Sequence, residues 1–539
     1  MFTPFAHGWT ALAPVLAMLI AGLGVLARRT GAPSSVLMLG AGVLLAWSNL
    51  LPPLRLDPEV VLTWLIPPLL YSSGVGMSWR GFRSNLRPIL LLAIGCVLFS
   101  TAAVAAAVHW AFGMPWAVAF VLGAIVSPPD AVAPMAILRR LGLPRRLLTV
   151  LEGESLVNDA TALVAFGFAV AAVGTGQFSA AAALGRFGAV VGSEVGWGLI
   201  VGWAMLRLRH LADEPRAEVL LALATPFVAF WPPHTMHASG VVACVTAGLW
   251  VSWNGPALIR PATRLQGFFI WGLVTWGTEA LVFLLTGLQA RGVVEGLGPG
   301  GLARASAIGL VTAAAAVLVR FAWVFPATYL PRLIPAVRAR DPFPNWRMPF
   351  LIGFTGLRGV VSLAAALSVP LTVPGRELIL FATFTVIMVT LVGEGLLLPV
   401  VVRRLGLTRL GGEELAGNRR DERAARLEGV DAVLRAVDRA EARGEPQGTV
   451  ASLRRHHQSR REHQSRSADA STPDDPVSEW GRLEAELVEV ERRAIARVYR
   501  ENRLTDEARR RIERELDLEE ARLRDQVASG GAIDALRDD

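Results

Sequence analysis

The sequence predicts an all-α polytopic membrane protein that ends in a small helical tail. Of its 539 residues 53% are hydrophobic, and a mean hydropathy of +0.45 is too high for one soluble core of that length. The apolar residues gather in stretches of about 19, the length that crosses a hydrocarbon core of about 30 Å. After residue 410 these stretches cease and charged residues dominate.

About thirteen apolar segments are expected to cross the membrane. In chain order they lie at 9–27, 34–51, 59–78, 88–111, 115–138, 147–173, 180–206, 217–233, 237–252, 267–289, 303–326, 348–370 and 377–402. An odd number of spans puts the two ends of the chain on opposite sides of the membrane.

The basic residues predict the orientation. All 53 are arginines, and 28 of them, against 15 acidic residues, precede residue 411, which gives that part a net charge of +13 and the tail −5. With thirteen spans, seven arginine-bearing connections fall on one side, which the positive-inside rule makes cytoplasmic. We therefore expect an outside N-terminus, a cytoplasmic tail and, because loops explain the basic excess, no nucleic-acid partner.

The two cysteines predict no special chemistry. Cys96 and Cys244 lie in apolar stretches and have neither a disulfide pattern nor metal-ligand spacing. We expect no cofactor.

Carboxylates inside apolar segments are the most informative feature of the chain. Asp130, Glu154 and Asp159 stand in or beside predicted membrane helices. An ionised Asp near the bilayer centre costs about 2.5 to 3.5 kcal/mol on insertion scales, so such residues face a polar cavity, pair, or bind ions. For Glu154 the alternative is a buried ion pair that only fixes helix register.

The fifth span is interrupted at Ser127-Pro128-Pro129-Asp130. Two prolines remove two backbone donors and free carbonyls at membrane depth, which is tolerated only beside protein or water. Interrupted helices of this kind form cation sites in secondary transporters. Asp130 either caps the second half-helix or contacts the ion directly, and both interpretations stay open. In a later span Gly356 and Gly359 flank Arg358, which indicates close contact around a buried guanidinium.

Four blocks of sequence resemble the monovalent cation:proton antiporters, the family of bacterial NhaP-type Na+/H+ antiporters and animal sodium/proton exchangers. They are SPPDAVAPMAILRRLGLPRRLLTVLEGESLVNDATALV at 127–164, TEALVFLLTGLQ at 278–289, RFAWVFPATYLPRLIP at 320–335 and GLRGVVSLAAALSVP at 356–370. The blocks stand in the family's order and cover the membrane part.

The resemblance implies a homodimer in the cell membrane. Each subunit would have inverted repeats and a scaffold packed against a moving six-helix core with two crossed, discontinuous helices. Residues 1–410 would form this exchanger domain, which would contribute to sodium transport and pH homeostasis. The protein would be a transporter rather than an enzyme.

The resemblance also assigns roles to single residues. Asp159 matches the carboxylate that binds cation and proton, with Asp130, Asn158 and Ser155 as further ion- or proton-binding positions. Glu154 matches the buried acid of a structural ion pair. Its partner would be Arg320, with Arg358 as the glycine-flanked arginine nearby.

The expected activity is exchange of a monovalent cation for H+ by alternating access. Na+ is the first choice, with Li+ and K+ as alternatives. Asp159 would bind cation and proton in competition, since only a neutralised site avoids the full cost of burying charge. Family members with Asp-Asp in place of Asn158-Asp159 tend to be electrogenic, so the asparagine favours electroneutral one-for-one exchange.

The chain departs from the family pattern in the ion pathway. Many relatives have an acidic residue where Ser72 aligns, and Pro129 replaces the commoner threonine. Ser127, Glu279 and Glu394 are candidate pathway residues.

Glu279 and Glu394 are as well explained by structural pairing as by the pathway. His234 and His237 are expected at an extracellular turn as solvated side chains rather than metal ligands, with pH sensing as the alternative role.

The alternative to exchange is a cation channel, or an ion- or pH-sensing membrane protein without coupled transport. A channel would show a filter loop or a pore repeat, and neither is visible.

The tail, residues 411–539, is expected to hold two charged helical tracts around a flexible linker near 443–477. It could self-associate, dock beneath the core, or provide a regulatory contact.

Overall fold

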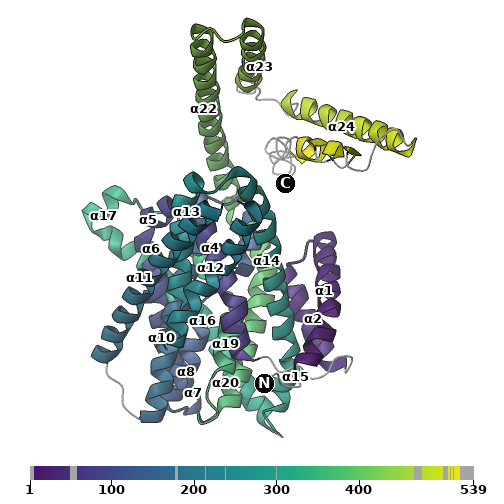
Figure 1. The fold of residues 1–539 in the computed structure, drawn as a ribbon. Coiled ribbons are helices and arrows are strands. Elements are labelled where there is room, and N and C mark those ends of the chain that lie inside the picture. Colours follow the sequence, from purple (N-terminus) through teal and green to yellow (C-terminus); the bar gives the residue numbers. More distant parts are fainter. Residues whose placement is uncertain are drawn as a thin grey trace. The chain divides into compact units, whose positions relative to one another are not determined.

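The computed structural model describes residues 5–48, 57–130, 132–175, 180–212, 214–236, 238–298, 300–466, 476–501, 508–509, 511–513 and 515–521. The described residues form helices and connections, with no β-strand among them. The chain divides into two compact units, residues 1–410 and 411–539, and Figure 1 shows the helices of the first unit packed side by side.

The membrane unit contains both long and interrupted helices (Figure 1). In chain order they are α1 (Phe5–Thr30), α2 (Ser34–Ser48), α3 (Pro58–Val60), η1 (Val61–Leu65), α4 (Ile66–Gly76), α5 (Trp79–Ser84), α6 (Leu86–Leu90), η2 (Leu91–Cys96), α7 (Val97–Phe112), α8 (Trp116–Val126), α9 (Val132–Leu138), η3 (Arg139–Leu141), α10 (Arg145–Thr175), α11 (Ala180–Ala212), α12 (Pro215–Thr235), α13 (Val241–Leu258), α14 (Pro261–Leu288), α15 (Ala290–Glu295), α16 (Gly301–Tyr329), η4 (Leu330–Leu333), α17 (Pro335–Arg340), α18 (Arg347–Phe354), α19 (Val360–Leu367), α20 (Arg376–Met388), η5 (Val389–Glu394) and α21 (Gly395–Leu405).

Eight helical stretches of the described chain are long and apolar enough to cross a membrane, and α2 and α8 are shorter apolar helices. The protein is therefore a multi-pass membrane protein. The count of thirteen spans stays a prediction.

Two helices are interrupted, and the interruptions meet. One lies between Val126 at the end of α8 and Val132 at the start of α9, where Pro128 and Pro129 cannot donate to a helix. The other separates α18 from α19. Where they meet, the backbone N–H of Asp130 donates to the carbonyl of Leu357 at 2.7 Å, so polar backbone from two distant parts of the chain is joined in the interior.

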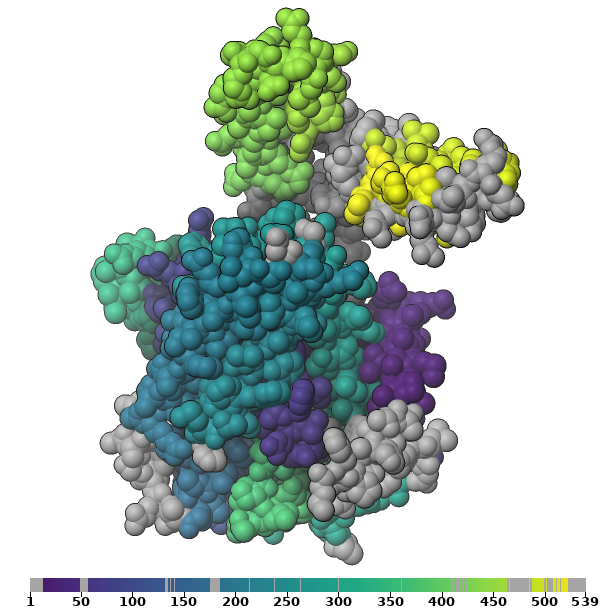
Figure 2. All heavy atoms as spheres, in the orientation of Figure 1, coloured from purple at the N-terminus to yellow at the C-terminus, as the bar shows by residue number. Residues whose placement is uncertain are grey.

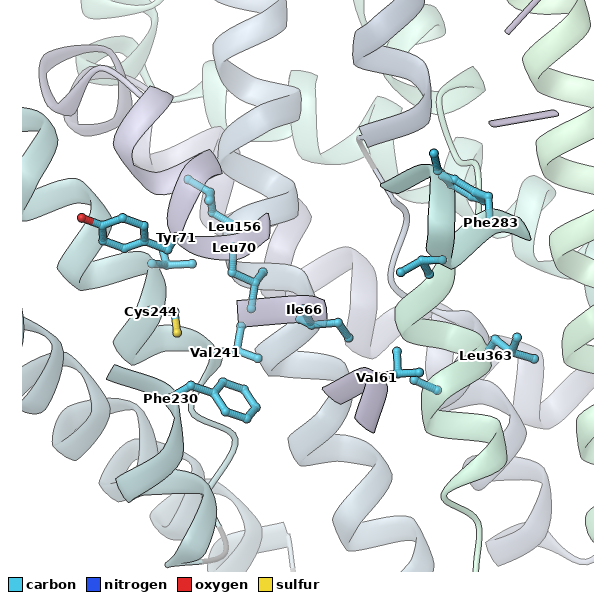
Figure 3. Close-up of a cluster of buried hydrophobic side chains, with 14 of the residues drawn as sticks. Val61, Ile66, Leu70, Tyr71, Leu156, Phe230, Val241, Cys244, Phe283 and Leu363 are labelled. Atoms are coloured by element: carbon cyan, nitrogen blue, oxygen red, sulfur yellow. The ribbon is translucent and has the colours of Figure 1, made fainter. Parts of the chain in front are cut away.

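A large apolar cluster surrounds this region. Figure 3 shows labelled members that come from η1, α4, α10, α12, α13, α14 and α19, among them Ile66, Leu156 and Phe283. Glycines let some of these helices approach closely. A methyl group on Gly42 of α2 would overlap Leu284 of α14, and one on Gly287 would overlap Leu39. Small residues at such contacts are the usual basis of helix packing in membranes.

The tail unit is helical over more of its length than the sequence predicts. It contains all but the first four residues of α22 (Leu407–Ala442), together with α23 (Gln447–Arg466) and α24 (Pro476–Arg500). The sequence predicts a flexible linker over residues 443–477. That prediction is wrong for residues 447–466, which form α23.

Ion pairs between α22 and α23 account for the difference: Arg454 contacts Asp438 and Glu441, and Arg461 contacts Asp431. Residues 467–475 of the expected linker lie outside the described residues.

Replacing Gly287 by Ala should destabilise the membrane unit by about 1–3 kcal/mol, because the new methyl group meets the backbone of α2, which cannot rotate away. Thermal unfolding of the detergent-purified protein measures the effect as a lowered melting temperature. Gly277→Ala on the same helix is the control, since a methyl group there meets nothing within 4 Å. Equal melting temperatures for the two variants would contradict the close contact.

Candidate ion-binding site

Asp159 lies where two cavities meet. The wider cavity has a volume of about 310 Å³ and runs past Leu163 and Ala171 toward the end of α10 at Thr175. The narrower one, about 60 Å³, includes Ser155, which lies one turn closer to the beginning of α10 at Arg145. Asp159 lines both cavities, so a single carboxylate faces spaces that extend toward opposite ends of its helix.

The narrow cavity gathers oxygen ligands between apolar walls. The carboxylates of Asp130 and Glu279 line it together with Asp159. Three hydroxyl side chains line it as well, those of Ser73, Ser155 and Ser362. Its walls include Ile66, Leu70, Leu156 and Phe283, which are among the side chains drawn in Figure 3. Carboxylate and hydroxyl oxygens are ligands suited to a hard cation, and adjacent carboxylates also repel one another until a positive charge arrives.

Two of these hydroxyl groups are absent from the sequence-based assignment. The family position aligned with Ser72, whereas the structure has Ser73 on the cavity wall. Ser362 is 2% exposed, and its Oγ has no hydrogen-bond partner among the described residues. One residue along a helix turns the side chain by about 100°, so the sequence alone could not decide which serine of the pair faces the cavity. For Ser362 the only signal was its position just after the Gly359 break.

Asn158 and Ser127 support the break and line neither of the two cavities at Asp159. The Asn158 Nδ2 donates to the carbonyl of Pro129 at 2.6 Å, one of the acceptors that the interrupted helix leaves free. Asn158 is fully buried. The Ser127 Oγ donates to the carbonyl of Ala124 at 3.1 Å. Both residues thus make hydrogen bonds at or beside the break after Val126, and their roles in ion binding stay predictions.

Gly359 is required by the position of Asp130. A methyl group at residue 359 would overlap the carboxylate of Asp130. Because the N–H of Asp130 also bonds to Leu357, the carboxylate is held against the second break. Asp130 stands at the break and also lines the narrow cavity, and both interpretations of its role stay predictions.

The structure joins Glu154 and Arg320 in a buried, two-point ion pair. The Arg320 Nη1 lies 2.6 Å from Glu154 Oε1, and its Nη2 lies 2.9 Å from Oε2. The side chains are 1% and 2% exposed. The Arg320 Nε donates to the carbonyl of Ile352 at 3.0 Å, so one guanidinium connects α10, α16 and α18. Gly356 allows this, because a methyl group there would lie 2.9 Å from Arg320 Cδ.

A second pair of buried charges lies beside the first. Arg358 is 1% exposed and Glu394 is 8% exposed, and Arg358 lies within electrostatic range of both Arg320 and Glu394. The Arg358 backbone N–H donates to Thr390 Oγ1 at 3.0 Å. Two positive and two negative side chains are thus buried together. Glu394 does not line the cavities at Asp159, whereas Glu279 does. The roles of both carboxylates stay predictions.

Comparisons with known proteins agree with this geometry. Residues 15–404 match the family model described as the transmembrane sodium/hydrogen exchanger. The chain belongs to the sodium/hydrogen exchanger family. An uncharacterized Na+/H+ exchanger of Mycobacterium tuberculosis is 33% identical over 96% of both chains. The Na+/H+ antiporter ApNhaP of Aphanothece halophytica is 32% identical over 71% of this chain and 72% of its own.

A solved structure shows the same fold. The sodium proton antiporter MjNhaP1 of Methanocaldococcus jannaschii superposes with a TM-score of 0.60 over 75% of this chain and 99% of its own, at 15% identity. This protein is a multi-pass membrane protein of the sodium/hydrogen exchanger family and shares the fold of that solved structure.

The wider cavity of this exchanger contains two basic side chains. Arg186 of α11 lines it and lies over the ring of Phe168, 6.0 Å from the centroid. His234 also lines it and stacks on Phe230 at 5.1 Å. His237 lies outside the described residues. Among the residues described, no group of three His, Cys, Asp or Glu has metal-binding geometry.

Replacing Glu154 by Gln should cost about 3–5 kcal/mol, because Arg320 is left as an uncompensated buried charge. Unfolding followed by tryptophan fluorescence in detergent tests this expectation. The double variant Glu154→Gln/Arg320→Gln should be less destabilised than either single variant. Glu295→Gln is the control, since its ion pair with Arg291 is exposed and should contribute less than about 1 kcal/mol. A Glu154→Gln protein as stable as the wild type would refute the structural role of the pair.

Proposed function

We propose that this protein exchanges Na+ for H+ one-for-one across the cell membrane, with Asp159 binding either ion but not both. Family membership supports cation/proton exchange, and the name of the relative from Aphanothece halophytica favours Na+. The observation that carries the mechanism is the position of Asp159 at the junction of two cavities that extend toward opposite ends of α10. Li+ and K+ are the alternative cations.

The cycle follows from the cost of burying charge. A bare carboxylate between apolar walls is unfavourable, and so is a site that carries both H+ and Na+. The core moves between its two positions only when Asp159 has bound one cation or one proton. Asp130, Ser155 and Glu279 supply further oxygens around Na+. Asn158 is uncharged, so no second carboxylate exchanges a proton at that position, and the exchange is electroneutral.

The topology that we propose has thirteen spans, including inverted repeats and the two interrupted helices as the crossed pair. The arginine-rich connections lie in the cytoplasm, and the N-terminus lies outside. The narrow cavity then leads to the cytoplasm and the wider one to the outside. The homodimer and a regulatory contact of the tail belong to the same proposal. The alternative is a channel or a sensor, which would conduct or bind cations without moving protons in exchange.

Replacing Asp159 by Asn should abolish cation-driven proton movement in proteoliposomes that contain a pH-sensitive dye, because the amide exchanges no proton. The Glu152→Gln variant should keep this cation-driven proton movement. Glu152 is a carboxylate on the same helix, but it pairs with the exposed Arg139 and does not line the cavities at Asp159.

The wild-type rate should not change when the membrane potential is clamped. Exchange by Asp159→Asn, or a rate that follows an imposed potential, would contradict the proposal. Current without proton movement would favour the channel.

Replacing Arg186 by Gln should lower the KM for Na+ severalfold when Na+ is added to the outer side at alkaline pH. The arginine lines the outer cavity, and its positive charge opposes the entry of cations. At acidic pH the KM should change little. The substitution strengthens the binding of H+ as much as the binding of Na+, and the two effects cancel where H+ competes for the site. The KM on the cytoplasmic side should be unaffected.

Arg291→Gln is the control for Arg186. Arg291 lies on α15, at the same end of the membrane unit, and pairs with Glu295 outside the cavity. His234, the other titratable group in the cavity apart from Asp159, is tested separately as His234→Gln. An unchanged KM for Arg186→Gln at every pH would show that this charge does not act on the entering cation.

A further inference from the structure

Three arginines converge on one carboxylate at the arginine-rich end of the membrane unit. Arg87 of α6, Arg146 at the start of α10 and Arg332 of η4 all contact Asp341. The Arg146 Nη2 lies 2.7 Å from Asp341 Oδ1, and the Arg332 Nη2 lies 2.8 Å from Oδ2. The cluster therefore joins the cytoplasmic ends of three helical elements that carry or support the ion site.

The cluster has an excess of positive charge. Burial opposes ionisation of Asp341, but the hydrogen bonds and charges of Arg146 and Arg332 outweigh it and hold the pKa of Asp341 below its usual range. One negative charge thus faces three positive charges at neutral pH, which leaves two in excess.

The excess charge is available on two of the arginines. Arg332 is 6% exposed and uses its remaining nitrogens on the carbonyls of Thr328 and Pro342. Arg87 and Arg146 are 34% and 47% exposed. Arg87 uses only Nη2 toward Asp341, so among the described residues its Nε and Nη1 have no other hydrogen-bond partner.

An apolar groove begins at these arginines. All three line it, and its volume is about 70 Å³. Its apolar walls include Leu91, Leu92, Leu147, Val150, Val324, Ala327 and Ile352. Positive side chains beside apolar walls match a ligand with an anionic group at one end and a hydrocarbon chain at the other.

The groove lies where such a ligand would be found. The segment that follows α16 exposes large apolar side chains, including Leu330, Leu333, Ile334, Phe343 and Trp346. Aromatic and basic residues together are typical of a membrane–water interface. Figures 1 and 2 show α17, within this segment, at the edge of the membrane unit beside α5 and α6. The arginine cluster is therefore at headgroup depth, at the perimeter.

We propose that this groove binds an anionic phospholipid of the cytoplasmic leaflet. The phosphate contacts Nε and Nη1 of Arg87 and Nη1 of Arg146, the nitrogens not used on Asp341 or Asn85. The first carbons of one acyl chain lie against the half-buried Leu91, Ala327 and Ile352. Charge-assisted hydrogen bonds from guanidinium to phosphate are among the stronger polar contacts, and basic pockets between membrane helices bind acidic headgroups. The bound lipid would clamp α6, α10 and α16, and so stabilise the core that carries Asp159.

The test is the thermal stability of the full-length protein in detergent with added phosphatidylglycerol, phosphatidylcholine or inorganic phosphate. Phosphatidylglycerol should raise the melting temperature by several degrees, and the other two should not. Arg87→Gln should lose more than half of this shift and still fold, since Asp341 keeps Arg146 and Arg332. Ala327→Leu, which fills the groove without changing charge, should lose it as well.

Arg83→Gln is the matched control, because Arg83 is an exposed arginine at the end of α5 that does not line the groove. It should keep the full shift. An equal loss with Arg83→Gln would show only general attraction to acidic lipid and would overturn the site. If inorganic phosphate raised the melting temperature as much as phosphatidylglycerol does, the acyl chain would have no role and the lipid site would be refuted. A full rise with phosphatidylglycerol in both Arg87→Gln and Ala327→Leu would also refute the proposal.

Discussion

The buried ion pair between Arg320 and Glu154 is the constraint on which the rest of the membrane unit depends. Each charge alone would cost several kcal/mol in an apolar interior, and the two-point contact removes that cost only while α10 and α16 keep one register. Asp159 lies five residues after Glu154, so the same register sets its position at the junction of the cavities. The pair lines neither cavity, yet its register places the carboxylate at which we propose that the ion binds.

The interrupted helices solve a related problem for neutral polar groups. Prolines at 128 and 129 free carbonyls inside the membrane, and Asn158 satisfies one of them. Gly356 and Gly359 have no side chains, which lets the second break contact Arg320 and Asp130. The result is a polar interior enclosed by the apolar cluster of Figure 3. Carboxylates and hydroxyls gather there, while the surrounding helices remain compatible with lipid.

Much of this arrangement could be predicted from the sequence, because proline pairs and buried charges leave clear local signals. The break at residues 127–130 follows from Pro128-Pro129 alone, and the importance of Asp159 follows from the cost of its charge. The rotation of helices could not be predicted: Ser73 rather than Ser72 faces the cavity, and Asn158 donates to the carbonyl of Pro129 in the break. Helix α23 was missed because its polar composition resembles a linker, while the ion pairs that hold it depend on α22.

The most direct test of the central claim is calorimetric titration of the purified protein with Na+ in buffers of different ionisation enthalpy, which counts the protons released for each cation bound. The account predicts one proton per Na+ at acidic pH, falling to none at alkaline pH, with apparent affinity that weakens tenfold for each unit of falling pH in the acidic range. Cation binding without proton release at any pH, or release of two protons per cation, would contradict competition at a single carboxylate.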